Sequence, residues 1–366
     1  MSALRVLLDT TWGADTGGTG RYVRSMRAAL QADPSVEVVC VNAPRLTRGH
    51  RLVRLPLNGV LHLAWTQVGI PALAWRRRVD VVHTTMTGPV WCPRPVVLTL
   101  HDALDFMPEW RPSRVWSGYM RSVGALAARR AAVVLTGTQA SAGEIGSFYR
   151  VAPERLRVTP YGSALLGVVA DGDNSTSPVG ASRHGGPGER RMEEGGLFFL
   201  MVGVADRRKD IGTGLRAVAL LQGGGVEMEA VVVGSAPREF AGANWVRTLT
   251  DVTDCELAWL YAHALAVLVP SRHEGYGLPV VEALAFGTPV VASDLPALRE
   301  VGGVAARYAR VGDVAAFARE LARVVERPAE ERQRVAQSAG GARAMTWDAT
   351  AQATVAIYRE LVRRGA

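Results

Sequence analysis

The sequence predicts an α/β fold made of two domains, each built around a parallel sheet. Short apolar runs with the length of buried strands alternate with longer helical patterns along most of the chain. Strands that alternate with helices form parallel sheets, because each helical crossover returns the chain to start the next strand in the same direction. At 366 residues, the chain is also longer than one hydrophobic core usually serves.

The amino-terminal half is expected to form the first sheet. Its apolar runs, which we interpret as strands, lie at residues 5–9, 36–41, 79–83, 96–100, 132–135 and 155–160. Helices are predicted at about 21–31 and from a capped start at 138–144. A glycine cluster, Gly17-Gly18-Thr19-Gly20, lies between the first strand and the first helix. Such a cluster lets a ligand approach the backbone closely, although turns are rich in glycine for other reasons as well.

The boundary between the domains is visible in the composition. Residues 163–196 are rich in Gly, Ser, Asp, Asn and Arg, with little periodicity from residue 171 onward. This composition is typical of a flexible linker or surface loop, and we expect residues 170–194 to be poorly ordered. The pair Asp171 and Asp173 falls in this stretch rather than at a strand end. It is therefore a poor candidate for a metal site, and no metal is predicted.

Composition also limits the class of protein. Hydrophobic residues make up 48% of the chain and the mean hydropathy is +0.09, as in globular proteins. Neither a run of eighteen apolar residues nor a signal-peptide pattern is found, so we expect a cytoplasmic protein. Cys40, Cys92 and Cys255 are odd in number and lack metal-ligand spacing, which predicts core or free thiols. The net charge of +8 permits anionic partners without naming one, and no nucleic-acid partner is predicted.

The carboxyl-terminal half contains the most informative segment. Residues 270–287 read Pro-Ser-Arg-His-Glu-Gly-Tyr-Gly-Leu-Pro-Val-Val-Glu-Ala-Leu-Ala-Phe-Gly and follow an apolar run at 266–269. Pro279 suits a first helical turn, so the amides of residues 275–278 are the unpaired donors of a helix N-terminus. These donors suit a phosphate, and the carboxylates Glu274 and Glu282 suit sugar hydroxyls. The alternative is a capped helix with two solvated glutamates.

A second candidate loop follows the apolar run at 198–203, which ends at Gly203. It contains Arg208 and Lys209, and Lys209 is the only lysine in the chain. Because arginine accounts for every other basic residue, a compact ammonium is a candidate requirement at this position, with chance retention as the alternative. Open α/β sheets bind ligands at the carboxyl ends of their strands, where this loop lies.

His101 and Asp102 end the predicted strand at 96–100, again at a carboxyl end. A histidine in this place is a site candidate, although it is also common as a polar strand terminus. Two further segments could meet a second substrate. Residues 61–78 mix apolar and arginine residues, as in membrane-surface helices or in a core-facing helix with a solvated end. Residues 106–130 contain Trp110, Trp116 and Tyr119, which either line a binding site or pack a loop on a helix.

The segment from His273 to Glu282 resembles the E-x7-E signature of retaining nucleotide-sugar glycosyltransferases, and specifically that of glycosyltransferase family 4. The resemblance extends over about residues 4–362 and implies the GT-B architecture, in which two Rossmann-like domains face each other across a cleft. The expected domains are an acceptor-side domain at 1–165, a linker at 166–196, a nucleotide-sugar-binding domain at 197–345 and a helix at 346–366 that crosses back.

The resemblance also implies roles for individual residues. Glu274 would face the donor sugar, Glu282 would hold the ribose hydroxyls, and Arg208 and Lys209 would contact the diphosphate, with Asp210 where the family often has Asn. His101 would lie near the reacting centre, supported by Asp102. The expected catalytic residues are His101, Arg208, Lys209 and Glu274. The expected donor-binding residues are Arg208 and Lys209 together with Gly17, Gly18, Gly20, Gly203, Gly275, Tyr276, Gly277, Leu278 and Glu282.

These expectations describe a retaining, metal-independent glycosyltransferase that needs no cofactor. Its substrates would be a UDP-, GDP- or other nucleotide sugar and a hydroxyl acceptor, which is a small molecule, a glycan or a lipid-linked molecule. Alternatives are a sugar-nucleotide epimerase and a non-catalytic sugar-nucleotide binder. A phosphorylase using pyridoxal phosphate is disfavoured, because Lys209 is already assigned to the phosphate loop. Peripheral contact with a membrane and the oligomeric state are left open.

Overall fold

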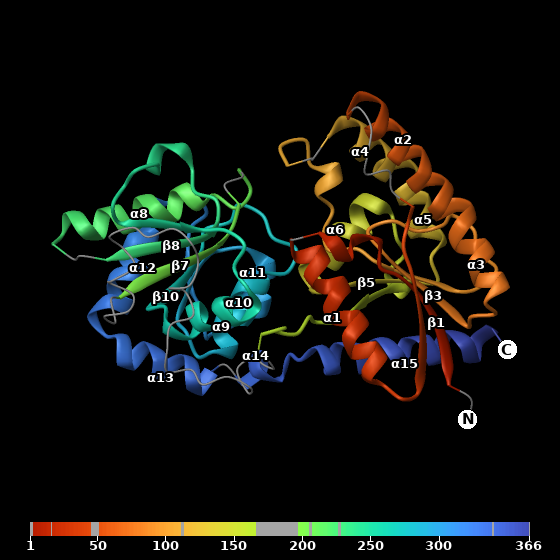
Figure 1. Ribbon diagram of the computed structural model, residues 1–366. Helices are drawn as coiled ribbons and strands as arrows, with labels where there is room; N and C mark the ends of the chain where they lie inside the picture. The colour runs from red at the N-terminus through yellow and green to blue at the C-terminus, as the bar shows by residue number, and fades with distance from the viewer. Residues whose placement is uncertain are drawn as a thin grey trace. The chain divides into compact units, whose positions relative to one another are not determined.

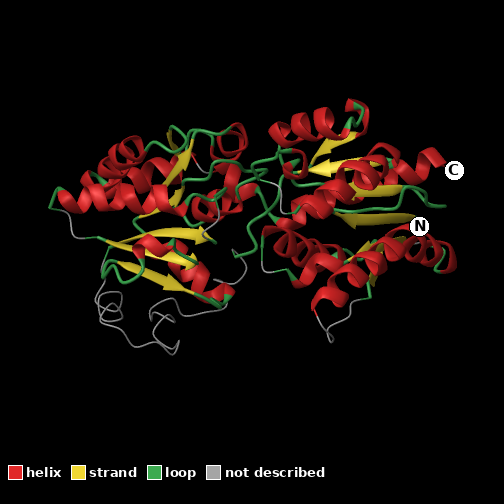
Figure 2. Ribbon diagram, turned by 90° about the horizontal axis from the view of Figure 1, so that it is seen from above, coloured by secondary structure: helices red, strands yellow, loops and turns green. Residues whose placement is uncertain are grey.

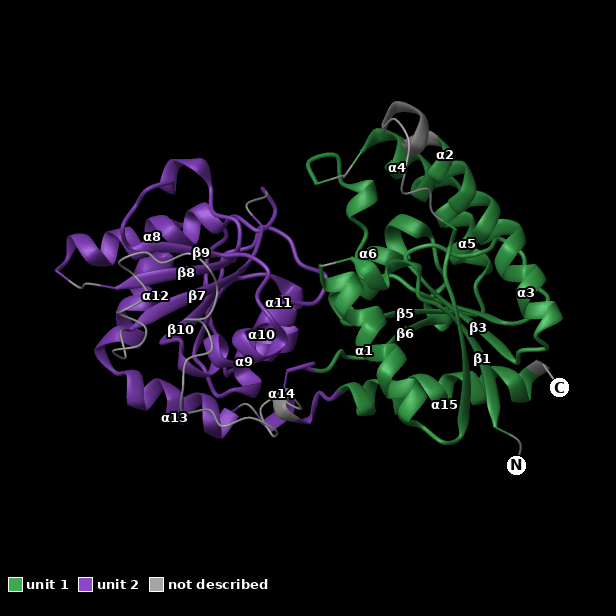
Figure 3. Cartoon of the chain, viewed as in Figure 1, with its two compact units in different colours: residues 1–162, 347–366 green, residues 163–346 purple. Residues whose placement is uncertain are grey.

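The computed structural model describes residues 3–15, 17–44, 51–110, 113–165, 197–204, 207–225, 228–338 and 340–365. The chain divides into two units, which are coloured separately in Figure 3: unit 1 is Met1–Gly162 with Trp347–Ala366, and unit 2 is Ser163–Thr346. Each unit contains a six-stranded sheet, and Figure 2 shows helices on both faces of each sheet. The stretch predicted to be poorly ordered, 170–194, and the pair Asp171 and Asp173 lie outside the described residues.

The sheet of unit 1 has the strand order β2-β1-β3-β4-β5-β6, and all neighbouring strands are parallel. The strands are β1 (Leu4–Asp9), β2 (Val36–Val41), β3 (Val81–Thr85), β4 (Val96–Thr99), β5 (Val133–Thr136) and β6 (Leu156–Val158). Strands β3, β4 and β5 are buried along their whole length, as expected for β-branched strands covered on both faces. The predicted parallel α/β sheet is therefore confirmed, with strand ends that differ from the prediction by a few residues.

Helices of unit 1 are labelled in Figure 1. They are α1 (Gly18–Ala32), α2 (Arg51–Ala64), α3 (Ile70–Arg76), α4 (Arg114–Tyr119), α5 (Ala125–Arg130), α6 (Gln139–Tyr149) and α15 (Trp347–Gly365). Two π-helical turns, η2 (Trp65–Gly69) and η4 (Met120–Gly124), join α2 to α3 and α4 to α5; the short 3-10 turns are η1 (Thr11–Ala14), η3 (Leu104–Phe106) and η5 (Pro153–Arg155). The predicted cap of α6 is present, because the Thr138 hydroxyl accepts a hydrogen bond from the Ser141 amide.

The last helix, α15, packs on the sheet of unit 1 through buried polar contacts. Tyr358 hydrogen-bonds the Nδ1 atom of His83 on β3, and the Nε2 atom of His83 lies 2.8 Å from the Thr99 hydroxyl on β4. The Thr350 hydroxyl donates to the Pro160 carbonyl over 2.7 Å. Burial lowers the pKa of His83 to about 3. His83 is therefore a neutral core residue that ties the end of the chain to the first sheet.

The sheet of unit 2 has the order β12-β11-β10-β7-β8-β9, again with parallel neighbours. Its strands are β7 (Phe198–Gly203), β8 (Glu229–Gly234), β9 (Val246–Leu249), β10 (Ala266–Val269), β11 (Val290–Ser293) and β12 (Arg307–Ala309). Its helices are α8 (Ile211–Gly223), α9 (Asp254–His263), α10 (Leu278–Ala285), α11 (Pro296–Gly302), α12 (Val314–Glu326), α13 (Pro328–Ser338) and α14 (Gly340–Ala344), with a 3-10 turn η8 (Arg238–Phe240). The two sheets confirm the predicted pair of Rossmann-like domains.

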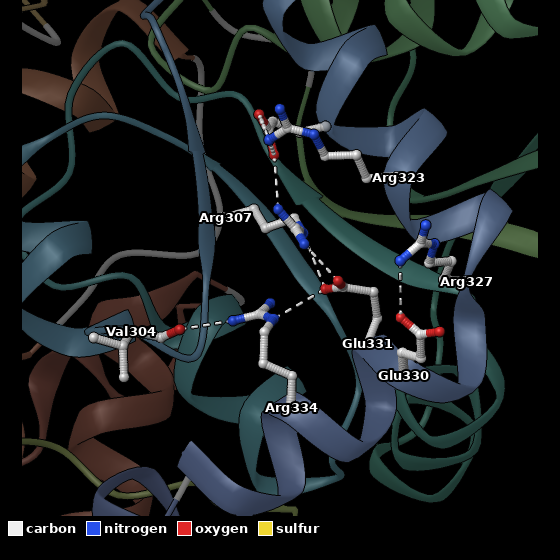
Figure 4. A network of polar contacts seen from close by, with 8 residues as sticks. Val304, Arg307, Arg323, Arg327, Glu330, Glu331 and Arg334 are labelled. Atoms are coloured by element: carbon white, nitrogen blue, oxygen red, sulfur yellow. Dashed lines mark hydrogen bonds and ion pairs between the residues drawn. The ribbon is translucent and has the colours of Figure 1, made fainter.

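A network of ion pairs fastens α12 and α13 to the edge strand β12 (Figure 4). Arg307 on β12 pairs with the buried carboxylate of Glu331 on α13 and, over 3.1 Å, with Glu320 on α12. Arg334 pairs with Glu331 over 3.0 Å and donates to the Val304 carbonyl over 2.6 Å. The hydrogen bonds from Arg307 hold the pKa of Glu331 below its usual range. This carboxylate is therefore stabilised in its charged form although it is almost fully covered.

Two sequence expectations concern burial and length. Cys40, Cys92 and Cys255 are free thiols, but Cys40 and Cys255 are exposed, so the interpretation as core residues was wrong for these two. Each lies where only part of the element faces a core, which an apolar sequence neighbourhood does not reveal. Among the helices that the structure describes, none combines the length and hydrophobicity needed to span a bilayer.

Candidate functional site

The signature segment forms a strand, a loop, a helix and a strand in unit 2. Strand β10 ends at Val269, the loop turns through Gly277, and α10 starts at Leu278 with Pro279 in its first turn. Gly277 has φ +102°, and a Cβ atom at this position would lie 2.5 Å from the Leu298 side chain. Glycine is therefore required here by both the backbone conformation and the close contact. The resulting helix N-terminus, with its unpaired amides, is suited to an anion.

Glu274 lies at the centre of a charged cluster in this loop. Its Oε1 atom accepts hydrogen bonds from Lys209 Nζ over 2.6 Å and from the Ser271 hydroxyl over 2.7 Å. Its Oε2 atom lies 3.6 Å from Arg208 Nη1, and its side chain is 7% exposed. Burial alone would raise the pKa of Glu274, but the charges of Lys209 and Arg208 outweigh this and lower the pKa below its usual range.

The cluster of Arg208, Lys209 and Glu274 keeps a net positive charge, because two cations face one carboxylate. Glu274 is consequently ionised at neutral pH and does not act as a proton donor. Its charge orients the two cations, which are partly exposed, with 25% of the Arg208 and 18% of the Lys209 side chain accessible. Such a group at the carboxyl ends of parallel strands can bind an anionic ligand such as a phosphate.

The backbone around Lys209 is fixed by several contacts. Gly203, at the end of β7, lies against the aliphatic part of Lys209, since a Cβ atom there would be 3.4 Å from Lys209 Cγ. Arg272 donates through its backbone amide to the Arg208 carbonyl over 2.7 Å and through its guanidinium to Asp210 over 2.8 Å. Asp210 also has φ +45°, a conformation that Asp and Asn tolerate better than most residues. Sequence reasoning missed Ser271 and Arg272, although both stand within three residues of Glu274.

Glu282 is placed differently from Glu274. It lies in the second turn of α10, is 2% exposed, and accepts a hydrogen bond from the Tyr261 hydroxyl on α9 over 2.7 Å. The Thr288 hydroxyl donates to the Tyr261 carbonyl over 2.5 Å. Tyr261 therefore fixes the orientation of Glu282. Nothing in the sequence around Tyr261 indicated this contact, because it joins residues twenty-one positions apart on different helices.

In unit 1, His101 follows β4 and lies among aromatic rings. Its Nδ1 atom is 3.0 Å from the Tyr161 hydroxyl, and its ring centroid lies 5.0 Å from that of Tyr22 and 5.5 Å from that of Tyr161. Its Nε2 atom is buried without a hydrogen-bond partner among the described residues. Burial lowers the pKa of His101 to about 4, so the ring is neutral at physiological pH. A neutral imidazole with one occupied nitrogen offers the other nitrogen for a single hydrogen bond.

The contact that holds the His101 ring comes from Tyr161 rather than from its sequence neighbour. Asp102, to which the sequence assigned the supporting role, accepts a hydrogen bond from the Leu104 amide over 3.2 Å and so fixes the turn that follows. Tyr161 itself stacks on Trp347 of α15, with ring centroids 6.0 Å apart and planes 9° from parallel. The sequence did not reveal this arrangement, because its members are far apart along the chain.

The glycine cluster of unit 1 is more helical than expected. The structure extends α1 back to Gly18, so Gly18 and Gly20 belong to its first turn and Gly17 is the N-cap. A Cβ atom at Gly20 would lie 1.8 Å from the Asp15 carbonyl oxygen. Close backbone packing therefore explains Gly20 without a ligand, and the prediction of an open loop was wrong there. The expected contacts of Gly17, Gly18 and Gly20 with a diphosphate stay predictions.

Trp116 and Tyr119, from the second segment expected to meet a substrate, pack in an aromatic group of unit 1. The Trp116 ring centroid lies 5.6 Å from that of Trp12 and 5.6 Å from that of Tyr119. His62 of α2 joins the same group, 5.7 Å from Trp12. The structural interpretation of this segment, helix packing, therefore accounts for both residues, and a substrate contact stays a prediction.

The expected site residues thus fall into two groups. Arg208, Lys209, Gly203 and Glu274 are brought together in unit 2, where Glu282 and the signature amides at 275–278 also lie. His101 and the glycines of α1 belong to unit 1. Among the described residues, no group of three or more His, Cys, Asp or Glu side chains is arranged to hold a metal ion.

Comparison with known proteins identifies the family. Residues 16–163 match the family model "Glycosyltransferase Family 4", and residues 197–327 match "Glycosyl transferases group 1". The chain is 31% identical to the MMP alpha-(1->4)-mannosyltransferase of Mycolicibacterium hassiacum over 316 residues, which are 80% of this chain and 73% of that protein. It is 30% identical to a D-inositol 3-phosphate glycosyltransferase of Segniliparus rotundus over 64% of this chain and 53% of that protein.

Solved structures share the fold. Sucrose-phosphate synthase from Thermosynechococcus elongatus superimposes with a TM-score of 0.74 at 19% identity, covering 99% of this chain and 100% of that one. The Anabaena protein HepE, solved in complex with UDP-glucose, gives a TM-score of 0.66 at 19% identity, covering 98% of this chain and 100% of that one. The two sheets, the signature loop and these matches agree with one another, and the chain belongs to glycosyltransferase family 4, with the GT-B fold and glycosyltransferase activity.

Proposed function

We propose that this glycosyltransferase moves a sugar from a nucleotide-sugar donor to a hydroxyl acceptor, without a metal ion and with retention of the anomeric configuration. The cluster of Arg208, Lys209 and Glu274 carries the proposal. Two cations held by one ionised carboxylate suit a diphosphate, and their net charge supplies the electrostatic help that a divalent metal gives elsewhere.

In the proposed reaction, the acceptor hydroxyl oxygen forms a bond to the anomeric carbon while the bond from that carbon to the diphosphate oxygen breaks. Negative charge then develops on the diphosphate, where Lys209 and Arg208 stabilise it. The hydroxyl proton passes to the departing phosphate oxygen, which is the base nearest to the attacking group on the front face. Attack and departure on one face retain the configuration. The mechanism needs no enzyme nucleophile, and Glu274, engaged by Lys209 and Ser271, is not placed to act as one.

The remaining site residues position the donor in this proposal. The signature amides at 275–278 bind the diphosphate, Glu274 accepts a hydrogen bond from a sugar hydroxyl, and Glu282 binds the ribose diol with the orientation that Tyr261 gives it. His101 acts as a neutral hydrogen-bond partner of the sugar, because its low pKa removes it from proton transfer near pH 7. The donor class is a UDP- or GDP-hexose. Two observations support it: HepE was solved with UDP-glucose, and the Mycolicibacterium relative is named a mannosyltransferase.

We further propose a cytoplasmic location. The support is the presence of three free thiols, two of them exposed, in the described part of the chain. Exposed thiols persist in reducing compartments and tend to form disulfides elsewhere.

The experiment is a donor screen with two readouts. The protein is incubated with UDP- and GDP-hexoses, with and without sugar and polyol acceptors and in the presence of EDTA, and both free nucleotide and sugar products are measured. We expect acceptor-dependent release of nucleoside diphosphate that EDTA does not abolish. Conversion of the donor into a stereoisomer without release would indicate an epimerase. Donor binding without any conversion would indicate a non-catalytic binder, and a full loss of activity in EDTA would contradict metal independence.

Variants of the two glutamates separate binding from turnover. Glu282→Ala should mainly weaken donor binding, because it removes the partner of the ribose diol. Lys209→Ala should mainly lower turnover, because its charge matters most as the diphosphate departs. Equal effects of both substitutions on donor affinity would contradict the separate roles.

A further inference from the structure

Helices α2 and α3, joined by the turn η2, form one nearly continuous helical segment along the edge of unit 1 (Figure 1). Six apolar residues of this segment are exposed and recur every three or four positions, as expected for one face of a helix. We call them the apolar stripe: Leu57, Val60, Ala64, Val68, Ala72 and Trp75. The larger members are well exposed, with 61% of Val60, 66% of Val68 and 71% of Trp75 accessible.

The stripe is not needed to hold the helix in place. The opposite face carries Thr66, Ile70 and Ala74, which are fully buried, and Ile70 and Ala74 belong to a core cluster with Leu7 and Val82 of the sheet. The segment is therefore anchored through one apolar face and presents a second one outward. The sequence had offered a core-facing helix and a membrane-surface helix as alternatives, and the structure shows that an outward apolar face exists beside the inward one.

Charge distinguishes this face from an ordinary helix surface. From residue 55 to residue 75 the sequence contains no Asp, Glu, Lys or Arg. Immediately afterwards come Arg76, Arg77 and Arg78, all exposed, and the sequence has arginine at positions 51 and 54 before the charge-free stretch. An apolar face bordered by arginine is typical of helices that lie in the plane of an anionic membrane surface. Trp75, at the border between the two, has the amphipathic ring that favours the headgroup region.

We propose that the apolar stripe docks unit 1 on an anionic lipid surface, with Val60, Val68 and Trp75 inserted at the level of the headgroups and Arg76–Arg78 bound to lipid phosphates. This inference does not depend on the transfer reaction. A second copy of the chain is a poorer occupant of the same face. Whether two such helices paired in parallel or antiparallel, arginine-rich ends would face arginine-rich ends, and like charges would oppose the contact.

The test is co-sedimentation of the full chain with phosphatidylcholine vesicles, with and without phosphatidylglycerol. The stripe variant is Val60→Glu combined with Val68→Glu, and Glu is a better helix former than Val, so the fold should be kept. The matched control is Leu220→Glu combined with Val304→Glu, which makes the same charge change at positions of unit 2 that are 55% and 80% exposed. Thermal melting and nucleotide release with free substrates check that both variants are folded.

We expect the wild type and the control to bind the vesicles that contain phosphatidylglycerol, and to bind less as salt is raised. The stripe variant should bind about thirtyfold more weakly, which is the effect of two charges held at an anionic surface. Arg76→Gln, Arg77→Gln and Arg78→Gln together should reduce binding to the anionic vesicles more than to pure phosphatidylcholine. A wild type that stays in the supernatant, or a stripe variant that binds as well as the control, would overturn the proposal. A wild-type dimer that the stripe substitutions dissociate, without vesicle binding, would assign the stripe to a second copy.

Discussion

The two units place their expected site residues on the same kind of scaffold but stabilise them by opposite means. In unit 2, the loop after β7 holds Lys209 against Glu274 over 2.6 Å, so that charge is paired with charge. In unit 1, the residue after β4 and its neighbour lead to His101, whose ring is kept neutral by burial and held by Tyr161 and Tyr22. The difference shows that position at the end of a parallel strand does not decide chemistry. The ionic loop is equipped to bind and stabilise an anion, whereas the aromatic one is equipped to orient a neutral group.

The largest expected effect comes from removing the cation of unit 2. Lys209→Ala should lower kcat by about a hundredfold to a thousandfold, the range found when one preorganised group that stabilises developing charge is deleted. Arg216→Ala is the matched control, because it removes a cation of the same unit whose pair with Glu239 is exposed. Steady-state kinetics with a saturating donor measure both. Near-normal turnover of the lysine variant would remove the diphosphate role.

A second effect compares a covered ion pair with an exposed one. Arg307→Ala leaves Glu331, which is 6% exposed, without its main partner, and should destabilise unit 2 by about 1–3 kcal/mol, allowing for the partial exposure of Arg307 itself. Arg216→Ala breaks an exposed pair and should change the free energy of unfolding by about 0–1 kcal/mol. Urea denaturation gives both values. Equal losses would mean that the network of Figure 4 adds no stability beyond that of a surface pair.

The pH dependence of stability should depend on the buried histidines of unit 1. Burial lowers the folded-state pKa of His83 to about 3 from an ordinary value of 6.5, so the unfolded chain binds a proton that the folded chain does not. Stability is therefore complete above pH 6.5 and falls with decreasing pH, by about 2 kcal/mol at pH 5 for this one residue.

Thermal melting between pH 7.5 and pH 5 measures this loss, and His83→Gln should make it smaller. Asp105 contributes in the opposite direction, since burial raises its pKa to about 6 and its ionised form costs stability above that pH. The wild type and His83→Gln share this contribution, so their difference isolates the histidine. Parallel curves for the two proteins would contradict the assignment.

The smallest effect concerns the residue that positions His101. Tyr161→Phe keeps the ring that stacks on Trp347 but removes the hydroxyl next to His101 Nδ1. We expect a loss of about tenfold in kcat/KM, because one hydrogen bond that orients the imidazole is missing. The pH profile between 5 and 8 should keep its shape, since His101 stays neutral in that range. A new inflection near pH 6.5 in the wild type would show that His101 titrates there and that its burial has been overestimated.

The fold was predictable because its signals are local. Runs such as Phe198–Gly203 and Val96–Thr99 are β-branched, short and bounded by glycine or polar residues, and they became buried strands. The start of α1 was missed by several residues because glycine is a poor helix former, and only the contact of Gly20 with the Asp15 carbonyl explains its presence in the first turn.

The site was predictable only in part. The residues of unit 2 stand in motifs, so Lys209, Arg208 and Glu274 could be named, and the structure adds the contact between them. The residues that orient the site could not be named, because Tyr161 lies sixty positions from His101 and Tyr261 lies on a different helix from Glu282. Such pairings depend on how strands and helices are arranged in space, which no local pattern encodes.

One measurement tests the central claim most directly. Proton NMR of the product formed from an anomerically pure nucleotide hexose, in EDTA, gives the configuration of the new bond and the need for metal together. The account predicts a product with the configuration of the donor, formed by the wild type and Lys209→Arg, and nearly absent with Lys209→Ala. A product of inverted configuration, or a reaction that proceeds only after a divalent metal is added, would contradict it.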